Sequence, residues 1–155
     1  MGEKELLLKL GEETIYSAKG HFKACDIRRV LVTFTIWSCA ILNIISLIGI
    51  DSTFDRILTM FTLIGLAALL IWNQGEDKNY RLRHKQIAEK YLALHKEIRT
   101  HYFLDKYDQI EVETLSKRVV ELDQSEKPEL PGIALKLARK AILKGETDNW
   151  FLEDK

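Results

Sequence analysis

The stretch VLVTFTIWSCAILNIISLIGI, residues 30–50, contains 21 consecutive residues without a charged side chain. A second uncharged stretch, ILTMFTLIGLAALLIWNQG, covers residues 57–75, and only three charged residues stand between the two. An α-helix rises about 1.5 Å per residue, so the first stretch can cross the roughly 30 Å hydrocarbon core of a bilayer. The second has a shorter apolar centre, residues 57–72, and needs residues 73–75 to reach the interface. We therefore predict a membrane hairpin of two transmembrane helices over residues 30–75.

Two other interpretations of the uncharged stretches are weaker. The core helices of a soluble bundle normally keep a polar face, and neither stretch has a charged residue on any face. The apolar core of a secretory signal has about 7 to 15 residues near the start of the chain. Residues 30–50 are longer than that and follow 29 mostly polar residues. The membrane hairpin is the interpretation that the sequence favours.

Basic residues flank the hairpin on both sides, whereas its connecting turn offers only Arg56. Basic residues near the ends of a span stay on the cytoplasmic side, where they also meet anionic lipid. We therefore expect a multi-pass membrane protein with both termini in the cytoplasm and a turn of about six residues outside. The flanking basic residues are Lys19, Lys23, Arg28 and Arg29 before the hairpin, and Lys78, Arg81, Arg83 and Lys85 after it.

The segments on either side of the hairpin have the periodicity of amphipathic helices. Residues 12–29 carry apolar side chains at helical spacing, with Gly20 as a candidate bend, and they complete an N-terminal cytoplasmic part, residues 1–29. After the second span, an apolar stripe recurs at alternating spacings of four and three, which predicts a long helix. The stripe is longer than a small lobe needs for its own core, so we expect copies of the chain to meet on it. Its candidate oligomer residues are Tyr80, Ile87, Tyr91, Leu94 and Ile98.

The remaining residues, 76–155, are predicted to form a cytoplasmic helical lobe. Charges sum to +3 over residues 76–104 and to −3 over residues 105–127, which favours antiparallel packing of the second stretch on the first. A last helix is predicted to begin near Pro131 and to end at Gly145. No strand pattern is evident, so the predicted fold class is all-α: a membrane hairpin with a cytoplasmic lobe.

Polar side chains gather on one face of each predicted span. Asn43 is the most informative, because a buried amide in lipid costs free energy unless it finds a hydrogen-bond partner, and one hairpin offers few. Such faces favour close helix packing, and they can also line a pore once copies assemble. Two spans cannot enclose a channel, so both interpretations point to a homo-oligomer. The pore-lining or helix-packing candidates are Thr35, Ser38, Asn43, Ser46, Thr59 and Thr62.

The last predicted helix is basic and amphipathic. Lys136, Arg139 and Lys140 lie on one side of it, opposite an apolar side. The simpler interpretation is an outer helix with solvated lysines. The functional alternative is a surface for anionic lipid or for a nucleotide signal.

Catalytic chemistry has little support in the sequence. No HExxH, GxSxG, CxxC or glycine-rich phosphate loop is present, and we interpret His84, His95 and His101 as packing or interfacial residues. His21 and Cys25 have i, i+4 spacing but make a poor metal site without further ligands. We expect no enzyme activity, cofactor or metal. Acidic and basic residues are matched at 23 each, so no nucleic-acid partner is expected directly.

The order of these parts resembles the SLATT family of two-span bacterial effectors. The likeness rests on a short amphipathic helix, IYSAKGHFKACDIRR, then two spans with a tiny turn, then a long helix, NYRLRHKQIAEKYLALHKEIR. It covers residues 12–145, and it provides no family active-site residues to carry over. The resemblance implies a membrane-disrupting or pore-forming effector of anti-phage defence, switched on by an upstream sensor protein or a nucleotide second messenger. The alternative is a non-conducting membrane-anchored scaffold that docks a partner protein.

Overall fold

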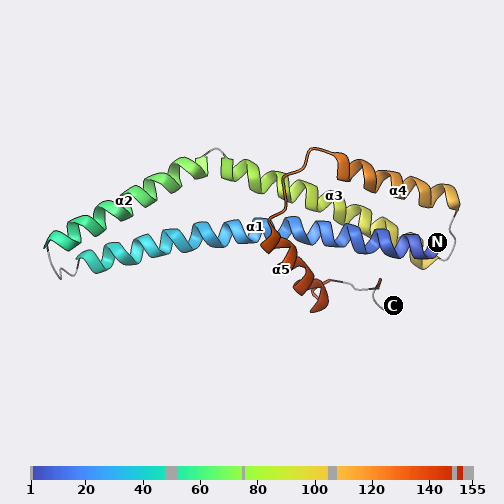
Figure 1. Ribbon diagram of the computed structural model, residues 1–155, viewed down its shortest axis with the longest axis horizontal. Coiled ribbons are helices and arrows are strands. Elements are labelled where there is room, and N and C mark those ends of the chain that lie inside the picture. Colours follow the sequence, from blue (N-terminus) through green and yellow to red (C-terminus); the bar gives the residue numbers. More distant parts are fainter. Residues whose placement is uncertain (1, 48–51, 75, 105–107, 148–149, 152–155) are drawn as a thin grey trace. The chain divides into compact units, whose positions relative to one another are not determined.

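The computed structural model of the protein describes residues 2–47, 52–74, 76–104, 108–147 and 150–151. Over these residues it contains α-helices and no strand, so the predicted all-α class is confirmed (Figure 1). The elements are α1 (Glu3–Leu47), α2 (Ser52–Gln74), α3 (Glu76–Leu104), α4 (Gln109–Gln124) and α5 (Gly132–Leu143).

The helices are distributed over two compact units. The lobe unit comprises residues 1–25 and 82–155, and the hairpin unit comprises residues 26–81. The first part of α1 therefore packs with the C-terminal helices instead of forming an N-terminal part of its own. Gly20 does not interrupt α1, which is a single helix across it. Its lack of a side chain allows a close approach instead, because a Cβ there would lie 3.1 Å from a methyl carbon of Leu130.

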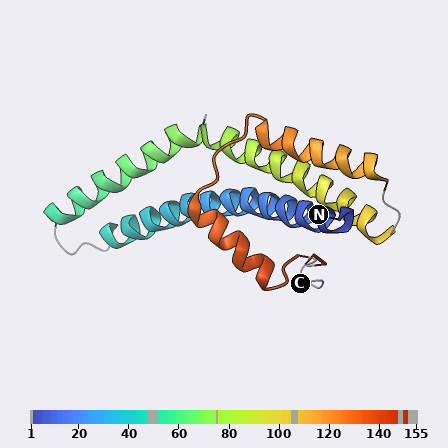
Figure 2. The same cartoon turned by 45° about the vertical axis from the view of Figure 1, so that its right-hand side comes forward.

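The lobe unit has a continuous apolar core. α1, α3 and α4 each contribute one apolar face to it, and Figure 2 shows α4 running alongside α3. Burial of these faces removes apolar surface from water, which is the main favourable term in forming the unit. The core side chains from the three helices are Leu7, Leu10 and Ile15, then Leu94, Ile98 and Tyr102, then Val112, Leu115 and Val119.

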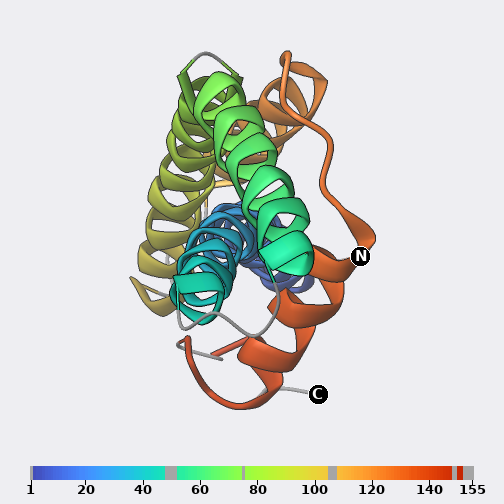
Figure 3. The same ribbon diagram turned by 90° about the vertical axis from the view of Figure 1, so that its left-hand side faces the viewer.

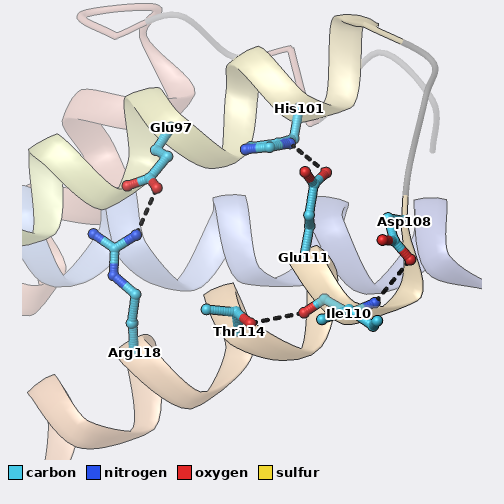
Figure 4. Close-up of polar contacts among 7 residues, drawn as sticks. All are labelled: Glu97, His101, Asp108, Ile110, Glu111, Thr114 and Arg118. Carbon is cyan, nitrogen blue, oxygen red and sulfur yellow. Dashed lines mark hydrogen bonds and ion pairs between the residues drawn. The ribbon is translucent and has the colours of Figure 1, made fainter.

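α4 packs antiparallel to α3, as the charge pattern predicted. Arg118 donates a hydrogen bond to Glu97, and His101 Nδ1 lies 3.5 Å from a Glu111 carboxylate oxygen, so numbers rise along one helix as they fall along the other (Figure 4). α4 begins where the Asp108 carboxylate accepts a hydrogen bond from the Ile110 amide at 3.3 Å.

α5 begins and ends close to the bounds that Pro131 and Gly145 predicted. Pro131 precedes its first turn, where a missing N–H leaves no donor unpaired. Gly145 has φ 74°, a left-handed conformation that costs glycine little, and the Glu146 amide reaches back 3.0 Å to the Ala141 carbonyl. This closing turn satisfies carbonyls at the end of the helix.

The segment after α5 returns to the core of the lobe unit, which the sequence did not predict. Trp150 and Phe151 are buried there. The indole N–H of Trp150 donates to His95 Nε2 at 3.4 Å, and His95 Nδ1 donates to the Gly11 carbonyl at 2.9 Å. A Cβ on Gly11 would lie 2.6 Å from the Trp150 ring, so this indole position requires glycine at residue 11.

In the hairpin unit, the second part of α1 and α2 run side by side in opposite directions (Figure 3). Within the described residues, α1 is the one helix long and apolar enough to cross a membrane by length and composition. Its most apolar 18-residue window is only 6% buried. The predicted turn falls partly on residues 48–51, outside the described residues.

Candidate functional site

A polar seam joins the two helices of the hairpin unit. The Thr62 hydroxyl donates to the Asn43 side-chain oxygen at 3.1 Å, and the Ser46 and Thr59 hydroxyls lie 3.0 Å apart. The structure thus brings together four of the six predicted pore-lining or helix-packing residues. All four come from one copy of the chain. We call this set, Asn43, Ser46, Thr59 and Thr62, the polar seam.

Most of the remaining hydrogen-bonding capacity of the seam is taken by nearby carbonyls. Asn43 Nδ2 donates to the Cys39 carbonyl at 2.8 Å, and the Thr59 hydroxyl donates to the Asp55 carbonyl at 2.8 Å. The Thr62 hydroxyl has one hydrogen but two acceptors in reach, because the Thr59 carbonyl lies 2.9 Å away. Asn43 thus finds one of the few partners that a single hairpin offers. Thr62 on the neighbouring helix supplies it.

The other two predicted pore-lining or helix-packing residues, Thr35 and Ser38, are not part of the polar seam. The Thr35 hydroxyl donates to the carbonyl of Leu31, four residues earlier on its own helix, at 2.9 Å. Ser38 is half-buried. Gly65 faces Cys39, but a Cβ at Gly65 would lie 3.6 Å from the thiol sulfur, an ordinary contact. The close pairing of the helices therefore does not depend on this glycine.

The outside of the hairpin unit is apolar. Phe61 and Ile64 of α2 are 71% and 65% exposed, and large apolar side chains of α1 are exposed in the same way. Among the described side chains of this unit, the buried ones are Cys39 and Thr62. The exposed set in α1 comprises Val30, Leu31, Phe34, Ile36, Trp37, Ile41, Leu42, Ile44 and Ile45, and α2 adds Ile57, Met60, Phe61, Leu63 and Ile64.

The predicted oligomer stripe lies inside the lobe unit. Ile87, Tyr91, Leu94 and Ile98 are buried against other parts of the same chain, so they present no surface to a second copy. α1 and α4 of the same chain cover this part of the stripe, and the expectation that copies assemble stays a prediction. Tyr80, the remaining member, belongs to the hairpin unit, where Arg28 lies 5.8 Å above its ring.

A buried polar cluster lies beside this core. His21 and His84 face each other with 2.7 Å between their Nδ1 atoms, and the His21 ring stacks on Tyr91. Burial, together with the neighbouring His84 and Lys127, lowers the pKa of His21 to about 4. Protons on both Nδ1 atoms would set two N–H groups against each other, so the contact requires one donor and one unprotonated acceptor and cannot persist with both rings charged. In the sequence, only the i, i+4 spacing of His21 and Cys25 was noted, and the contact between His21 and His84 was not predicted.

The hydroxyl of Tyr91 connects the cluster to the end of α4. It donates to Asp123, and the Lys127 ammonium donates to the Tyr91 oxygen at 2.8 Å and to Asp123 at 2.7 Å. Burial and the bond to Asp123 raise the pKa of Tyr91. Burial alone would raise the pKa of Asp123, but its bonds from Lys127 and Tyr91 hold that pKa below its usual range. The arrangement is a packed, paired network.

The predicted lipid or ligand residues lie on α5 of the lobe unit. Lys136, Arg139 and Lys140 are exposed on α5, on the side away from its buried alanines. His84 and His95 are buried packing residues, as predicted. In the described part of the chain, no three His, Cys, Asp or Glu side chains gather as a metal site would require.

Over its described residues, the chain is all-helical, with one candidate membrane helix and a helical lobe unit. Comparisons with known proteins give no match to a family model, to a curated protein or to a solved structure.

Proposed function

We propose that the chain is a two-span protein of the bacterial inner membrane that acts as an effector of anti-phage defence. One observation carries the membrane part of this proposal: the hairpin unit turns its apolar side chains outward and pairs its polar ones across the seam. In water such a surface would aggregate, whereas in lipid it is the stable arrangement. α2 has 23 residues and a length of about 34 Å, which is sufficient for the second span of this proposal.

The orientation follows from the charges beside the spans. Both flanks of the hairpin are basic and its turn is not, so the lobe unit and both termini belong in the cytoplasm. We expect Thr53→Cys, in a background without Cys25 and Cys39, to react with an impermeant thiol reagent from outside intact cells. Glu5→Cys, exposed on the lobe unit, is the matched control and should stay unlabelled. The opposite pattern of labelling would overturn the orientation.

The effector part rests on the resemblance to SLATT proteins together with the seam. The seam residues form their hydrogen bonds within one copy, which suits a resting state. When an upstream sensor protein or a nucleotide second messenger acts on the chain, copies assemble and exchange these bonds for contacts with neighbours or water. The result is an ion leak that arrests or kills the infected cell.

Purified chain in proteoliposomes tests the effector against the scaffold alternative. An effector should release an entrapped ion once triggered, for example by the product of a neighbouring sensor gene, and its expression with that sensor should stop growth. A scaffold should insert equally well and leak nothing under either condition. Insertion without any triggered leak would favour the scaffold, which the self-contained hydrogen bonding of the seam also permits.

A further inference from the structure

α5 presents an unusual outer face. Its buried side consists of small residues and Ile142, whereas its exposed side carries large aliphatic residues between basic ones. Ile133 and Leu143, near the two ends of the helix, are each 66% exposed, and Leu135 and Leu137 are also exposed. Ile133, Lys136, Leu137, Lys140 and Leu143 follow one another at helical spacing and share this face.

The charge of this face has one sign. α5 contains Lys136, Arg139 and Lys140 and no acidic residue, and Lys144 follows directly. An outer helix that only faces water would have no reason to expose three large aliphatic side chains, Ile133, Leu137 and Leu143, among its lysines. Aliphatic side chains between long basic ones are the pattern of a helix that lies in a membrane interface, where the basic stems stay apolar and their heads reach phosphate.

We propose that the outer face of α5 binds the anionic lipid headgroups of the membrane that holds the hairpin. A second copy of the chain suits the face poorly, because a symmetric contact would set these basic side chains against each other. A lipid surface has the complementary charge and accepts the aliphatic side chains as well. This inference rests on the proposed membrane residence, which would keep α5 at a high effective concentration near lipid.

The inner side of α5 is fixed independently of this face, so the face can be changed without unfolding the helix. Ala134, Ala138, Ala141 and Ile142 are buried in the lobe unit. Beyond the end of the helix, Lys23 of α1 forms an ion pair with Glu146 at 3.3 Å. Substitutions at the exposed Lys136 and Lys140 touch none of these contacts.

The test is hydrogen–deuterium exchange of α5 in the full chain, with phosphatidylcholine nanodiscs compared with nanodiscs that also contain phosphatidylglycerol. Each basic residue near an anionic leaflet strengthens binding about fivefold, so α5 amides should exchange at least about tenfold more slowly with phosphatidylglycerol present. Raised salt should weaken the effect. Lys136→Glu with Lys140→Glu should abolish it. Lys9→Glu with Lys117→Glu, an exposed pair with the same change in charge, should not.

The other outcomes are distinct. Equal exchange in both lipids, or equal loss with the control pair, overturns the proposal. Equal protection by ATP added to phosphatidylcholine nanodiscs also overturns it and assigns the face to a soluble anion. If the chain fails to enter nanodiscs but phosphatidylglycerol vesicles still protect α5, the lipid face stands and the proposed two-span insertion falls. If the chain inserts and the amide exchange of α5 does not depend on lipid composition, the membrane insertion of the hairpin is supported and the lipid-binding role of α5 is rejected.

Discussion

Ile64 in the hairpin unit and Ile110 in the lobe unit are exposed to similar extents, 65% and 70%, yet their neighbours differ. Ile110 stands on α4 among charged side chains, with the apolar face of that helix buried behind it. Ile64 is one of a continuous set of exposed apolar residues, and behind it lies the polar seam. The lobe unit buries a large apolar core, whereas the hairpin unit exposes its apolar side chains and pairs polar ones between its helices. The hydrophobic effect produces the first arrangement in water, and hydrogen bonding in lipid favours the second.

Truncation of a core residue should give the largest contrast between the units. Ile98 is fully buried in the lobe unit, so Ile98→Ala should lower the free energy of unfolding of that unit by about 2 to 5 kcal/mol. Ile44→Ala, the matched change on the exposed face of the hairpin unit, should leave the lobe unit unchanged. Amide exchange of α4 in detergent measures both. Equal effects would mean that the two faces do not differ in burial as described.

A lysine introduced at an exposed apolar position of each unit also tests whether the two outer faces differ in their surroundings. Ile64→Lys should reduce membrane insertion by about 2.5 to 3.5 kcal/mol, because an ammonium in the hydrocarbon core loses its hydration. Ile110→Lys should change stability by no more than about 0.5 kcal/mol, since a lysine there stays in water. The fraction of chain retained in alkali-washed membranes provides the measurement. Normal retention of the Ile64 variant would argue that α2 is not a span.

The sequence predicted much of this division, because charge and helical period are local properties. Uncharged stretches marked the hairpin, opposite charges predicted α4 on α3, and Pro131 and Gly145 marked the ends of α5. Contacts between distant segments were not predictable in this way. A helical period shows that Asn43 and Thr62 each lie on a polar face, but the register between two helices decides whether they meet.

The lobe unit illustrates the same limit. The stripe through Tyr91 was correctly predicted to be apolar, but the sequence did not show that α1 and α4 of the same chain cover it. Helical periodicity also could not predict that Trp150 packs over Gly11, because a single aromatic residue after the last helix forms no repeating pattern. These contacts depend on shape complementarity, which a single sequence does not display.

Acid should loosen the lobe unit and leave the hairpin unit unaffected. His21 has an ordinary pKa of about 6.5 when the chain is unfolded, and burial with the neighbouring His84 and Lys127 lowers it to about 4 in the folded unit. The unfolded chain therefore binds more protons between these values, so stability is complete above the unfolded pKa and falls as the pH drops toward the folded one. From about pH 7.5 to about pH 5, the loss from His21 should be about 2 kcal/mol.

The measurement is amide exchange of both units across this pH range, corrected for intrinsic rates. All four histidines of the chain belong to the lobe unit, so α2 should show no matching change. His21→Leu should reduce the slope for the lobe unit, since an aliphatic side chain has no proton to bind. A slope unchanged by that substitution would assign the acid sensitivity to other groups.

The smallest expected effect concerns the polar seam, and it decides whether the seam serves packing alone. Asn43→Leu removes the acceptor of the Thr62 hydroxyl, and Thr62→Val removes the donor at similar volume. A hydrogen bond between membrane helices is worth about 1 kcal/mol, so a double-mutant cycle on these two changes should give a coupling of about that size. Such a loss leaves insertion and expression intact, because both replacements suit lipid.

If the seam opens to water when the effector is triggered, the same variants should lose ion leak and toxicity almost completely, since an apolar lumen dewets. Ile44→Leu on the outer face is the control and should change neither. If the two residues are coupled but the triggered leak is unchanged, the seam serves packing alone and any conducting path lies elsewhere. If they are coupled and the leak is lost, the Thr62–Asn43 hydrogen bond that holds the hairpin closed is also part of the conducting path.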